Sequence, residues 1–553
     1  MNTLRIVWKQ DGSIVETPIE SGLTLAQHLY VSGAFQGRPL CSGAGGCGLC
    51  RVRYLSGAPE PLPEERGLLS PARLDEGYRL SCRRPPVPGS TVEASRGPDG
   101  EPRQVAAGST REDAADCGGS GADSPMPAPG SALGIDLGTT SIHWRFEGPG
   151  GARGGSFRNP QLGAGSEVMS RLALARSPHG AARLREGVVR AVRDILQAAG
   201  ARPQCVCVAG NTCMIYLALG MDVAGLSGAP YRVDWPGGAI ARLDGELPEV
   251  YIPPLLAPFV GGDVSAGLSA LEFSATPPRP PYLLADLGTN GEFALVLADG
   301  RVLVASVPMG PALEGVGMAS GMMAGPGAAV AFGISPTGLS PVAYSDTSGA
   351  ASAASAGQPA AARGAAIGGA SLRGISGTGY VSLLARLLSL GVVDRSGLFA
   401  QGAVSPLAAR VGAGITRKRG QPCLELFGGV KLFASDVEAL LKVKAAYCAA
   451  VGVLLDEAGL SFSGLTEVLL AGALGENIQA TDLEALGFFP PGGAARVRAV
   501  GNTSLDGAVL AAARPDVRDW LSKLPGRTRL VDVLSKPDFQ QLYMDCMRFA
   551  HDR

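Results

Sequence analysis

The sequence has no apolar run long enough to span a membrane, which excludes an integral membrane protein and a membrane partner. It also has no surplus of charge of either sign, because 48 basic residues face 49 acidic ones and the formal net charge is -1. No strong field is available to attract nucleic acid or anionic lipid, and we expect neither as a partner. Residues 1–5 lack the basic and apolar blocks of a signal peptide, which favours a cytoplasmic protein.

Histidine is scarce, and its 4 residues are dispersed without metal-ligand spacing. The 11 cysteines are an odd number in a chain without a recognisable export signal. This argues against a disulfide framework and for reduced thiols and metal ligation. Most cysteines are scattered and are interpreted as small buried side chains. Four of them, however, lie within the first 82 residues.

These four residues, Cys41, Cys47, Cys50 and Cys82, begin with the pattern C-x5-C-x2-C, and glycines fill the intervals. Two sulfide-bridged irons need four thiolates from a closely wrapped loop whose N–H groups point at sulfur, and glycine permits such a backbone. The pattern predicts a [2Fe-2S] cluster, with a first interval that resembles that of adrenodoxin-like ferredoxins. A structural zinc site is the alternative, although zinc sites usually pair two closely spaced couples and Cys82 has no near partner.

The segment around these cysteines predicts a β-grasp domain over residues 1–94. Residues 4–18 alternate about Asp11-Gly12, which predicts a β-hairpin with a type I′ turn. Thr24 and Gln27 have the spacing of a capping box that opens a helix through about Val31.

Two segments are biased in composition. Residues 95–131 consist largely of Gly, Ser, Asp, Ala and Pro, too few apolar groups to offset the entropy of ordering, and predict a flexible linker. Residues 345–370 are rich in Ala, Gly and Ser and predict a surface insertion within a folded domain. Elsewhere strands alternate with amphipathic helices in an α/β manner.

An internal repeat indicates a duplicated architecture, because LGIDLGTT at residues 133–140 recurs as LADLGTNG at residues 284–291. We place the two half-domains at residues 132–281 and 282–553. In such a strand-turn the glycine admits phosphate oxygens, the hydroxyls donate to them, and the aspartate holds Mg²⁺ through water. The residues expected to do so are Asp136, Gly138, Thr139 and Thr140, and in the second copy Asp286, Gly288, Thr289 and Asn290.

One such loop alone is equally consistent with a simple tight turn. Two that face each other across a cleft would clamp a nucleoside triphosphate and its metal. Residues 468–475 add a buried strand that enters a glycine turn, where Gly472 and Gly475 are expected to pack on adenine and ribose. The same turn also forms without a ligand.

These three loops, in this order, resemble those of the actin, sugar kinase and Hsp70 (ASKHA) superfamily, which implies two RNase H-like halves around a nucleotide cleft. The whole chain is more similar to the reductive activators of corrinoid-dependent proteins (RACo-like), which join a ferredoxin domain to such an ATPase domain. Residues 159–161, 210–212, 259–263, 286–292, 310–315, 501–503 and 536–539 carry this resemblance. The family's Gly-Ile-Cys-Gly-Ser-Gly reads Gly-Ile-Ser-Gly-Thr-Gly at residues 374–379, and Pro308-Met309 replaces the usual Ala-Ala.

The resemblance implies an ATP-hydrolysing protein that returns an electron from its [2Fe-2S] cluster to the inactive Co(II) corrinoid of a methyltransferase carrier protein, restoring Co(I). It implies ATP and Mg²⁺ as further cofactors, a corrinoid protein and an upstream electron donor as partners, and it leaves a homodimer open. Asp286, Glu292 and Glu314 are the expected catalytic residues, with the glutamates positioning water. A helix N-terminal carboxylate is the alternative for Glu314.

In this interpretation the linker lets the ferredoxin domain visit both the electron donor and the docked corrinoid protein. Two other functions fit the same motifs. One is a metabolite kinase with a fused redox-sensing ferredoxin domain, and the other is an electron-transfer module on a degenerate, non-hydrolysing scaffold.

Overall fold

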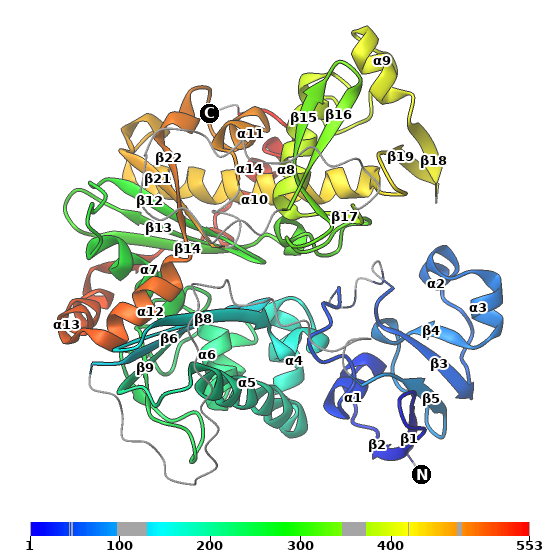
Figure 1. Ribbon diagram of the computed structural model, residues 1–553, viewed down its shortest axis with the longest axis horizontal. Coiled ribbons are helices and arrows are strands. Elements are labelled where there is room, and N and C mark those ends of the chain that lie inside the picture. Colours follow the sequence, from blue (N-terminus) through cyan, green and yellow to red (C-terminus); the bar gives the residue numbers. More distant parts are fainter. Residues whose placement is uncertain are drawn as a thin grey trace. The chain divides into compact units, whose positions relative to one another are not determined.

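The computed structural model describes residues 2–41, 43, 45, 48–96, 130–344, 372–418, 420–472 and 478–551. Cys47, Gly475, most of the predicted linker and the predicted insertion therefore lie outside the described residues. The described chain divides into two compact units (Figure 1). Unit 1 comprises the residues up to Ala270 together with Ser504–Ser522, and unit 2 comprises Leu271–Thr503 and the residues from Lys523 onward.

Unit 1 begins with a β-grasp domain, as predicted. Its elements are β1 (Thr3–Trp8), β2 (Ile14–Pro18), α1 (Leu25–Val31), β3 (Arg51–Ser56), α2 (Pro63–Leu68), α3 (Pro71–Asp75), β4 (Tyr78–Leu80) and β5 (Thr91–Ala94). The five strands form one sheet in the order β2-β1-β5-β3-β4. Alternate residues of β1, among them Leu4 and Ile6, form the core with Leu25 and Leu29 of α1.

The predicted capping box and hairpin are confirmed, but the predicted type I′ turn is wrong. Thr24 and Gln27 exchange hydrogen bonds at the start of α1, with the Thr24 N–H donating to Gln27 Oε1 at 2.8 Å. The hairpin loop runs from the end of β1 to Ile14, and of its residues Gly12 alone has positive φ. The Trp8 N–H donates to the Ser13 carbonyl oxygen at 2.9 Å and closes a longer loop, within which the Asp11 carboxylate accepts the Ser13 N–H at 2.9 Å.

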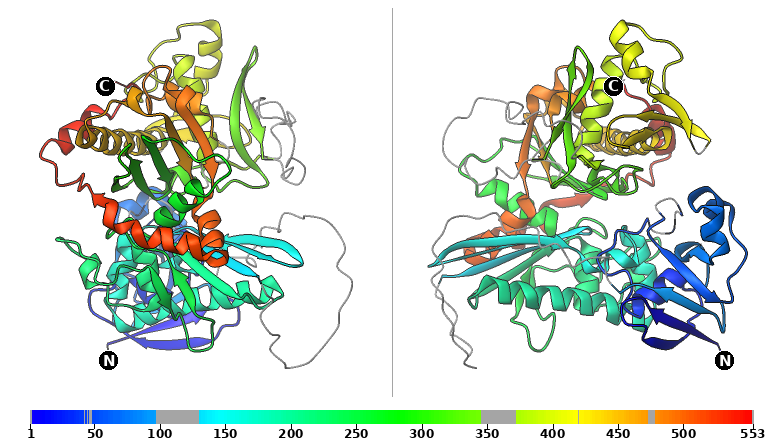
Figure 2. Two further views of the ribbon diagram at one scale, coloured as in Figure 1. Left: turned by 90° about the vertical axis from the view of Figure 1, so that its left-hand side faces the viewer. Right: turned by 45° about the vertical axis from the view of Figure 1, so that its right-hand side comes forward.

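The rest of unit 1 is the first RNase H-like half. Its elements are β6 (Ala132–Leu137), β7 (Ser141–Gly148), β8 (Gly151–Arg158), the 3-10 turn η2 (Pro160–Ala164), α4 (Val168–Ala175), α5 (Pro178–Ala199), β9 (Cys205–Gly210), α6 (Thr212–Leu219), β10 (Ala239–Ala241), β11 (Val250–Ile252), α7 (Gly262–Glu272), α12 (Thr503–Ala513) and α13 (Pro515–Lys523). The sheet order is β10-β11-β9-β6-β7-β8, with β6 parallel to β9 and antiparallel to β7. β7 and β8 form a long ribbon at one edge (Figure 2).

Unit 2 has a main sheet in which five strands repeat the arrangement of five strands in unit 1. Its elements are β12 (Tyr282–Leu287), β13 (Asn290–Val296), β14 (Val302–Pro308), η4 (Pro311–Glu314), β15 (Ala328–Ser335), β16 (Gly338–Ala343), β17 (Gly374–Ile375), α8 (Gly377–Ser389), α9 (Pro406–Gly412), β18 (Ile415–Lys418), β19 (Gln421–Glu425), β20 (Lys431–Phe433), α10 (Ala434–Ala458), β21 (Glu467–Ala471), α11 (Ala480–Ala485), β22 (Val497–Gly501), β23 (Thr528–Leu530) and α14 (Phe539–Asp545). The main sheet has the order β22-β21-β12-β13-β14-β23, and the long helix α10 packs on β13 and β14 (Figure 1). Since β12 occupies the place that β6 has in unit 1, the duplicated architecture is confirmed.

The described boundaries differ from the predicted half-domains in two respects. Residues 271–281, predicted in the first half, cluster with unit 2, and residues 504–522, predicted in the second half, cluster with unit 1. Two glycines make this packing possible, because a Cβ on Gly134 of β6 would lie 2.5 Å from Val509, and one on Gly507 would overlap the Ala266 carbonyl oxygen. Helix α12 therefore closes on β6 and α7 at a distance that only glycine allows.

Within the described residues, no helix has both the length and the apolar character needed to cross a membrane.

Candidate functional site

The predicted cluster cysteines that the structure describes come together. The Sγ atoms of Cys50 and Cys82 lie 3.2 Å apart, and the neighbouring sulfurs of Cys41 and Cys50 raise the pKa of the Cys82 thiol. Thiols this close are costly to ionise together, and a di-iron centre compensates their charge. The residues present therefore fit a [2Fe-2S] cluster, with Cys47 as the expected fourth ligand.

The loop before Cys50 has the backbone that such a cluster needs. Gly43, Gly45 and Gly48 have φ values of +90°, +73° and +65°, which other residues adopt only at a cost. The Arg83 guanidinium donates to the Gly43 carbonyl oxygen at 3.0 Å, and a Cβ on Gly45 would meet the Arg83 side chain at 3.0 Å. The glycines thus let the loop wrap the segment that carries the last cysteine.

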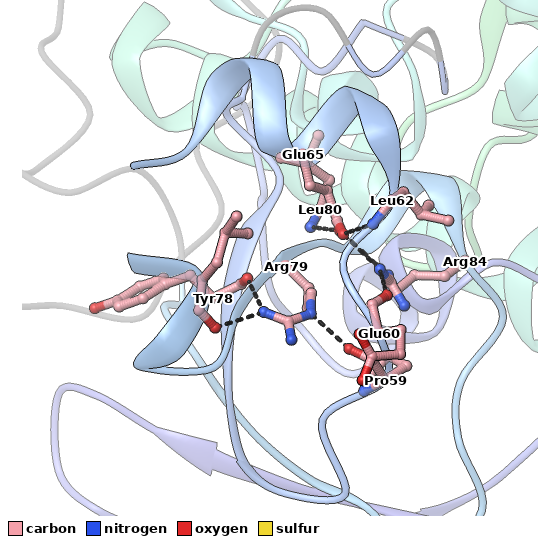
Figure 3. Close-up of polar contacts among 9 residues, drawn as sticks. Pro59, Glu60, Leu62, Glu65, Tyr78, Arg79, Leu80 and Arg84 are labelled. Carbon is pink, nitrogen blue, oxygen red and sulfur yellow. Dashed lines mark hydrogen bonds and ion pairs between the residues drawn. The ribbon is translucent and has the colours of Figure 1, made fainter. Parts of the chain in front are cut away.

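A buried ion pair fixes that segment (Figure 3). Glu65 is fully buried, and its carboxylate accepts from Arg84 at 2.5 Å, from the Leu80 N–H at 2.7 Å and from the Leu62 N–H at 2.8 Å. Arg79 donates to three backbone carbonyl oxygens of the same region. Because Leu80 and Arg84 flank Cys82 on both sides, Glu65 positions Cys82.

The first predicted phosphate loop follows β6. Asp136 lies near the end of the strand, and its Oδ1 accepts the Ser504 hydroxyl at 2.8 Å. A Cβ on Gly138 would lie 2.6 Å from the Ser141 carbonyl oxygen, so the tight hairpin itself requires glycine here.

The carbonyl oxygens of this loop are held by two buried side chains. Asn159 donates to Gly138 through its side chain at 2.8 Å and to Thr140 through its backbone at 2.9 Å. Arg171, which is fully buried, donates to Thr139 at 2.6 Å. Carbonyls that would repel a phosphate are thereby turned to protein donors, and the buried guanidinium adds a positive charge beside the loop.

Asp263 is a second carboxylate at this loop that sequence reasoning missed. Burial raises its pKa to about 7, and the charge of nearby Asp136 acts in the same direction. A cation beside the two carboxylates would offset the repulsion that Asp136 exerts on Asp263, so their donor set fits Mg²⁺. Residues 259–263 carried the family resemblance, which was the available signal for Asp263.

The second predicted loop belongs to unit 2 and gathers most of its predicted residues. Asp286 and Glu292 are direct cross-strand partners, which places their side chains on one face. The Thr289 hydroxyl donates to Glu314 Oε1 at 2.9 Å. A Cβ on Gly472, at the end of β21, would lie 2.5 Å from Asp286 Oδ1, so the third predicted loop approaches this carboxylate.

Gly288 differs from its counterpart in the first loop. A Cβ there would meet the Asn290 carbonyl oxygen and Glu314 Oε1 at 3.6 Å, which is ordinary contact. These contacts therefore do not require glycine at this position, in contrast to Gly138.

Fold and site together define the class: an iron-sulfur ferredoxin domain joined to an ASKHA-type domain of two RNase H-like halves. Family models agree along the chain. The 2Fe-2S iron-sulfur cluster binding domain matches residues 9–87, the RACo middle region matches residues 131–276, and the C-terminal domain of RACo, the ASKHA domain, matches residues 281–553. The chain belongs to the RACo family.

Individual relatives are similar over large parts of the chain. The corrinoid activation enzyme RamQ of Eubacterium limosum is 27% identical over 438 residues, 74% of this chain and 69% of that protein. The [Co(II) methylated amine-specific corrinoid protein] reductase of Methanosarcina barkeri is 31% identical over 258 residues, 46% of this chain and 43% of that protein. A solved reductive activator for corrinoid, iron-sulfur protein shares the fold with a TM-score of 0.64 at 21% identity, covering 99% of this chain and 98% of that one.

Proposed function

We propose that this chain is an ATP-dependent reductive activator, which passes one electron from its [2Fe-2S] cluster to the Co(II) corrinoid of a methyltransferase carrier protein and restores Co(I). The observation that carries the proposal is the similarity to two relatives named for corrinoid activation and for reduction of a Co(II) corrinoid protein. Their names favour this activity over a metabolite kinase or a non-hydrolysing module.

The chain's own residues suit the proposed roles. Cys41, Cys47, Cys50 and Cys82 would hold the cluster, which supplies a one-electron carrier when bound. The Glu65 ion pair fixes the segment that carries Cys82, so buried side chains of the protein help to position the proposed ligands.

At the phosphate loops, hydroxyl and N–H donors would bind the phosphates of ATP, and the carboxylates would hold Mg²⁺. The residues proposed for these two roles in the first loop are Asp136, Thr139, Thr140 and Asp263. In the second loop they are Asp286, Thr289 and Asn290. Glu292 and Glu314, which lie beside Asp286 and Thr289, would orient the attacking water.

The test mixes the anaerobically purified protein with a low-potential reductant, ATP, Mg²⁺ and a Co(II) carrier protein, and follows the Co(I) absorption. We expect Co(I) to appear only with ATP, and to be lost in Cys50→Ser and strongly reduced in Asp286→Asn. Asp299→Asn, the same change at an exposed turn, is the matched control and should behave as the unchanged protein. No ATP-dependent Co(I) with any methyltransferase carrier would refute the proposal.

A further inference from the structure

The ferredoxin domain is seated on the first half rather than only tethered to it. Tyr30 of α1 donates to the Pro160 carbonyl oxygen at 3.3 Å, and the Gly37 N–H reaches the same oxygen at 3.4 Å. The Ser166 N–H donates to the Leu40 carbonyl oxygen at 3.1 Å, directly before the first cluster cysteine. We call residues 160–166 the ferredoxin seat.

The contact is close and specific. Tyr30 is 1% exposed and belongs to the apolar core of the first half. A Cβ on Gly163 of the seat would overlap the Phe35 carbonyl oxygen. Phe35 itself has a φ of +60°, a strained value for a bulky residue that persists only where the surroundings fix it. Backbone of the ferredoxin domain thus fits backbone of the seat.

The seat is also bound to the first phosphate loop. Asn159, which directly precedes the seat, donates to the carbonyl oxygens of Gly138 and Thr140. Arg171 donates to the Gly165 carbonyl oxygen of the seat at 3.0 Å and to the Thr139 carbonyl oxygen of the loop at 2.6 Å. A continuous set of hydrogen bonds therefore leads from the phosphate loop, through two buried side chains, to the backbone beside the cluster.

Phosphate binding would change the strength of the hydrogen bonds to the loop carbonyls. The carbonyls of Gly138 and Thr139 share their peptide groups with the N–H groups of Thr139 and Thr140. An N–H that donates to a phosphate polarises the carbonyl of the same peptide and makes it a better acceptor. Phosphate bound at the loop would thus strengthen the hydrogen bonds that Asn159 and Arg171 donate to the loop carbonyls.

We propose that nucleotide at the first phosphate loop tightens the seating of the ferredoxin domain, with Asn159 and Arg171 as the positioning residues that couple the two. The inference rests on the proposed ATP binding. It gives the nucleotide a second role: the cluster domain is held while ATP is bound and is released to its redox partners when the loop empties. By linkage, seating the ferredoxin domain raises the affinity for ATP by the same factor.

The test uses the full-length holoprotein under anaerobic conditions, with and without saturating ATP and Mg²⁺. Hydrogen exchange is measured at the amides of Gly37 and Ser166, which donate across the seat. We expect ATP to slow both by about fivefold or more, the range of ordinary allosteric coupling. Calorimetry on the same samples gives the affinity for ATP.

Gly163→Ala should unseat the domain, abolish the exchange response and weaken ATP binding by the same factor. Gly150→Ala, where a Cβ meets no atom within 4 Å, is the matched control. Tyr30→Phe removes only the hydroxyl bond to Pro160 and should halve the response or more, which serves if Gly163→Ala does not fold. Asn159→Asp keeps the acceptor for the Gln161 N–H and loses the donor to Gly138, so it should abolish the response at saturating ATP.

Two results would overturn the inference in distinguishable ways. ATP that binds without slowing exchange at Gly37 and Ser166 refutes the coupling and leaves the proposed function standing. No ATP binding at all refutes both.

Discussion

At the residue scale, the buried pair of Glu65 and Arg84 determines how firmly the segment that carries Cys82 is held. Replacing Glu65 by Gln leaves the Arg84 guanidinium buried without its counter-charge, which typically costs about 3–5 kcal/mol. We expect Glu65→Gln to lower the free energy of unfolding of the ferredoxin domain by this amount and to lose cluster absorbance on mild heating. Glu16→Gln breaks an exposed pair with Arg5 and should cost less than about 1 kcal/mol.

The two loop glycines should respond differently to alanine. Gly138→Ala runs into the Ser141 carbonyl oxygen and should destabilise unit 1. Gly288→Ala meets only ordinary contacts, so we expect a change in stability within about 1 kcal/mol. If a phosphate approaches this backbone, the affinity of the Gly288→Ala variant for ATP should fall about tenfold, or about 1.4 kcal/mol, in calorimetry. Gly402→Ala, with open space around the new Cβ, should change neither quantity.

Glu20 adds a pH-dependent contact between the ferredoxin domain and the start of α5. Its carboxylate accepts the Ser177 hydroxyl at 2.5 Å and lies 2.7 Å from His179, and these contacts lower its pKa from the ordinary 4.5. A lowered pKa in the folded state means that the contact stabilises above pH 4.5 and is lost as the pH falls below it. His28 also faces Glu20 and acts to lower the pKa of its carboxyl.

We therefore expect Glu20→Gln to lower the free energy of unfolding at pH 7 by less than about 1 kcal/mol, because the carboxylate is partly exposed. The variant should melt slightly below the unchanged protein. The difference in melting temperature should shrink once the pH falls below 4.5. A difference that persists or grows in acid would contradict this account.

Side-chain chemistry with a local signature could be predicted from the sequence. The cluster cysteines and the loop aspartates stand in short patterns whose spacing the chemistry dictates. Asn159 and Arg171 could not be found as anchors of the phosphate loop, because their partners lie far away in sequence and are backbone carbonyls, which carry no residue signature. Asp263 stood in a family segment, but only its burial beside Asp136 shows its part in the site.

At the scale of elements, the packing of α12 on the first half depends on a missing side chain. A Cβ on Gly507 would overlap the Ala266 carbonyl oxygen of α7. Alanine gains about 1 kcal/mol in helix propensity, but this overlap outweighs the gain, as overpacking typically costs about 1–3 kcal/mol. We expect Gly507→Ala to lower the denaturant midpoint of unit 1. Gly526→Ala, which meets nothing within 4 Å, should leave it unchanged.

Strands and helices with a local sequence signature were predictable, whereas the geometry of a turn and the return of the chain from one unit to the other were not. The capping box of α1 and the strand that carries Asp136 depend on neighbouring residues and were confirmed. The hairpin turn differed because the Asp11 side chain bonds the Ser13 N–H, a competition that the dipeptide Asp-Gly does not reveal. The return of residues 504–522 to unit 1 depends on glycine contacts between distant segments, which no local pattern encodes.

At the scale of the whole molecule, unit 1 is discontinuous in sequence. A chain that ends at Ala270 lacks α12 and α13, and Gly134 of β6, which receives Val509 of α12, would be left exposed. We expect this fragment to aggregate or to be digested rapidly in limited proteolysis. Joining residues 503–523 to it through a flexible linker should restore a cooperative melt, while a scrambled version of the same segment should not.

The same discontinuity has a consequence for synthesis in the cell. Domains generally fold as units as they leave the ribosome, the N-terminal one first. Here the β-grasp domain emerges complete, but the half on which it sits must wait for a segment translated after most of unit 2. Nascent chains thus pass through a stage in which the ferredoxin domain is complete and the first RNase H-like half is not. Chaperones have the greatest opportunity to act at this stage.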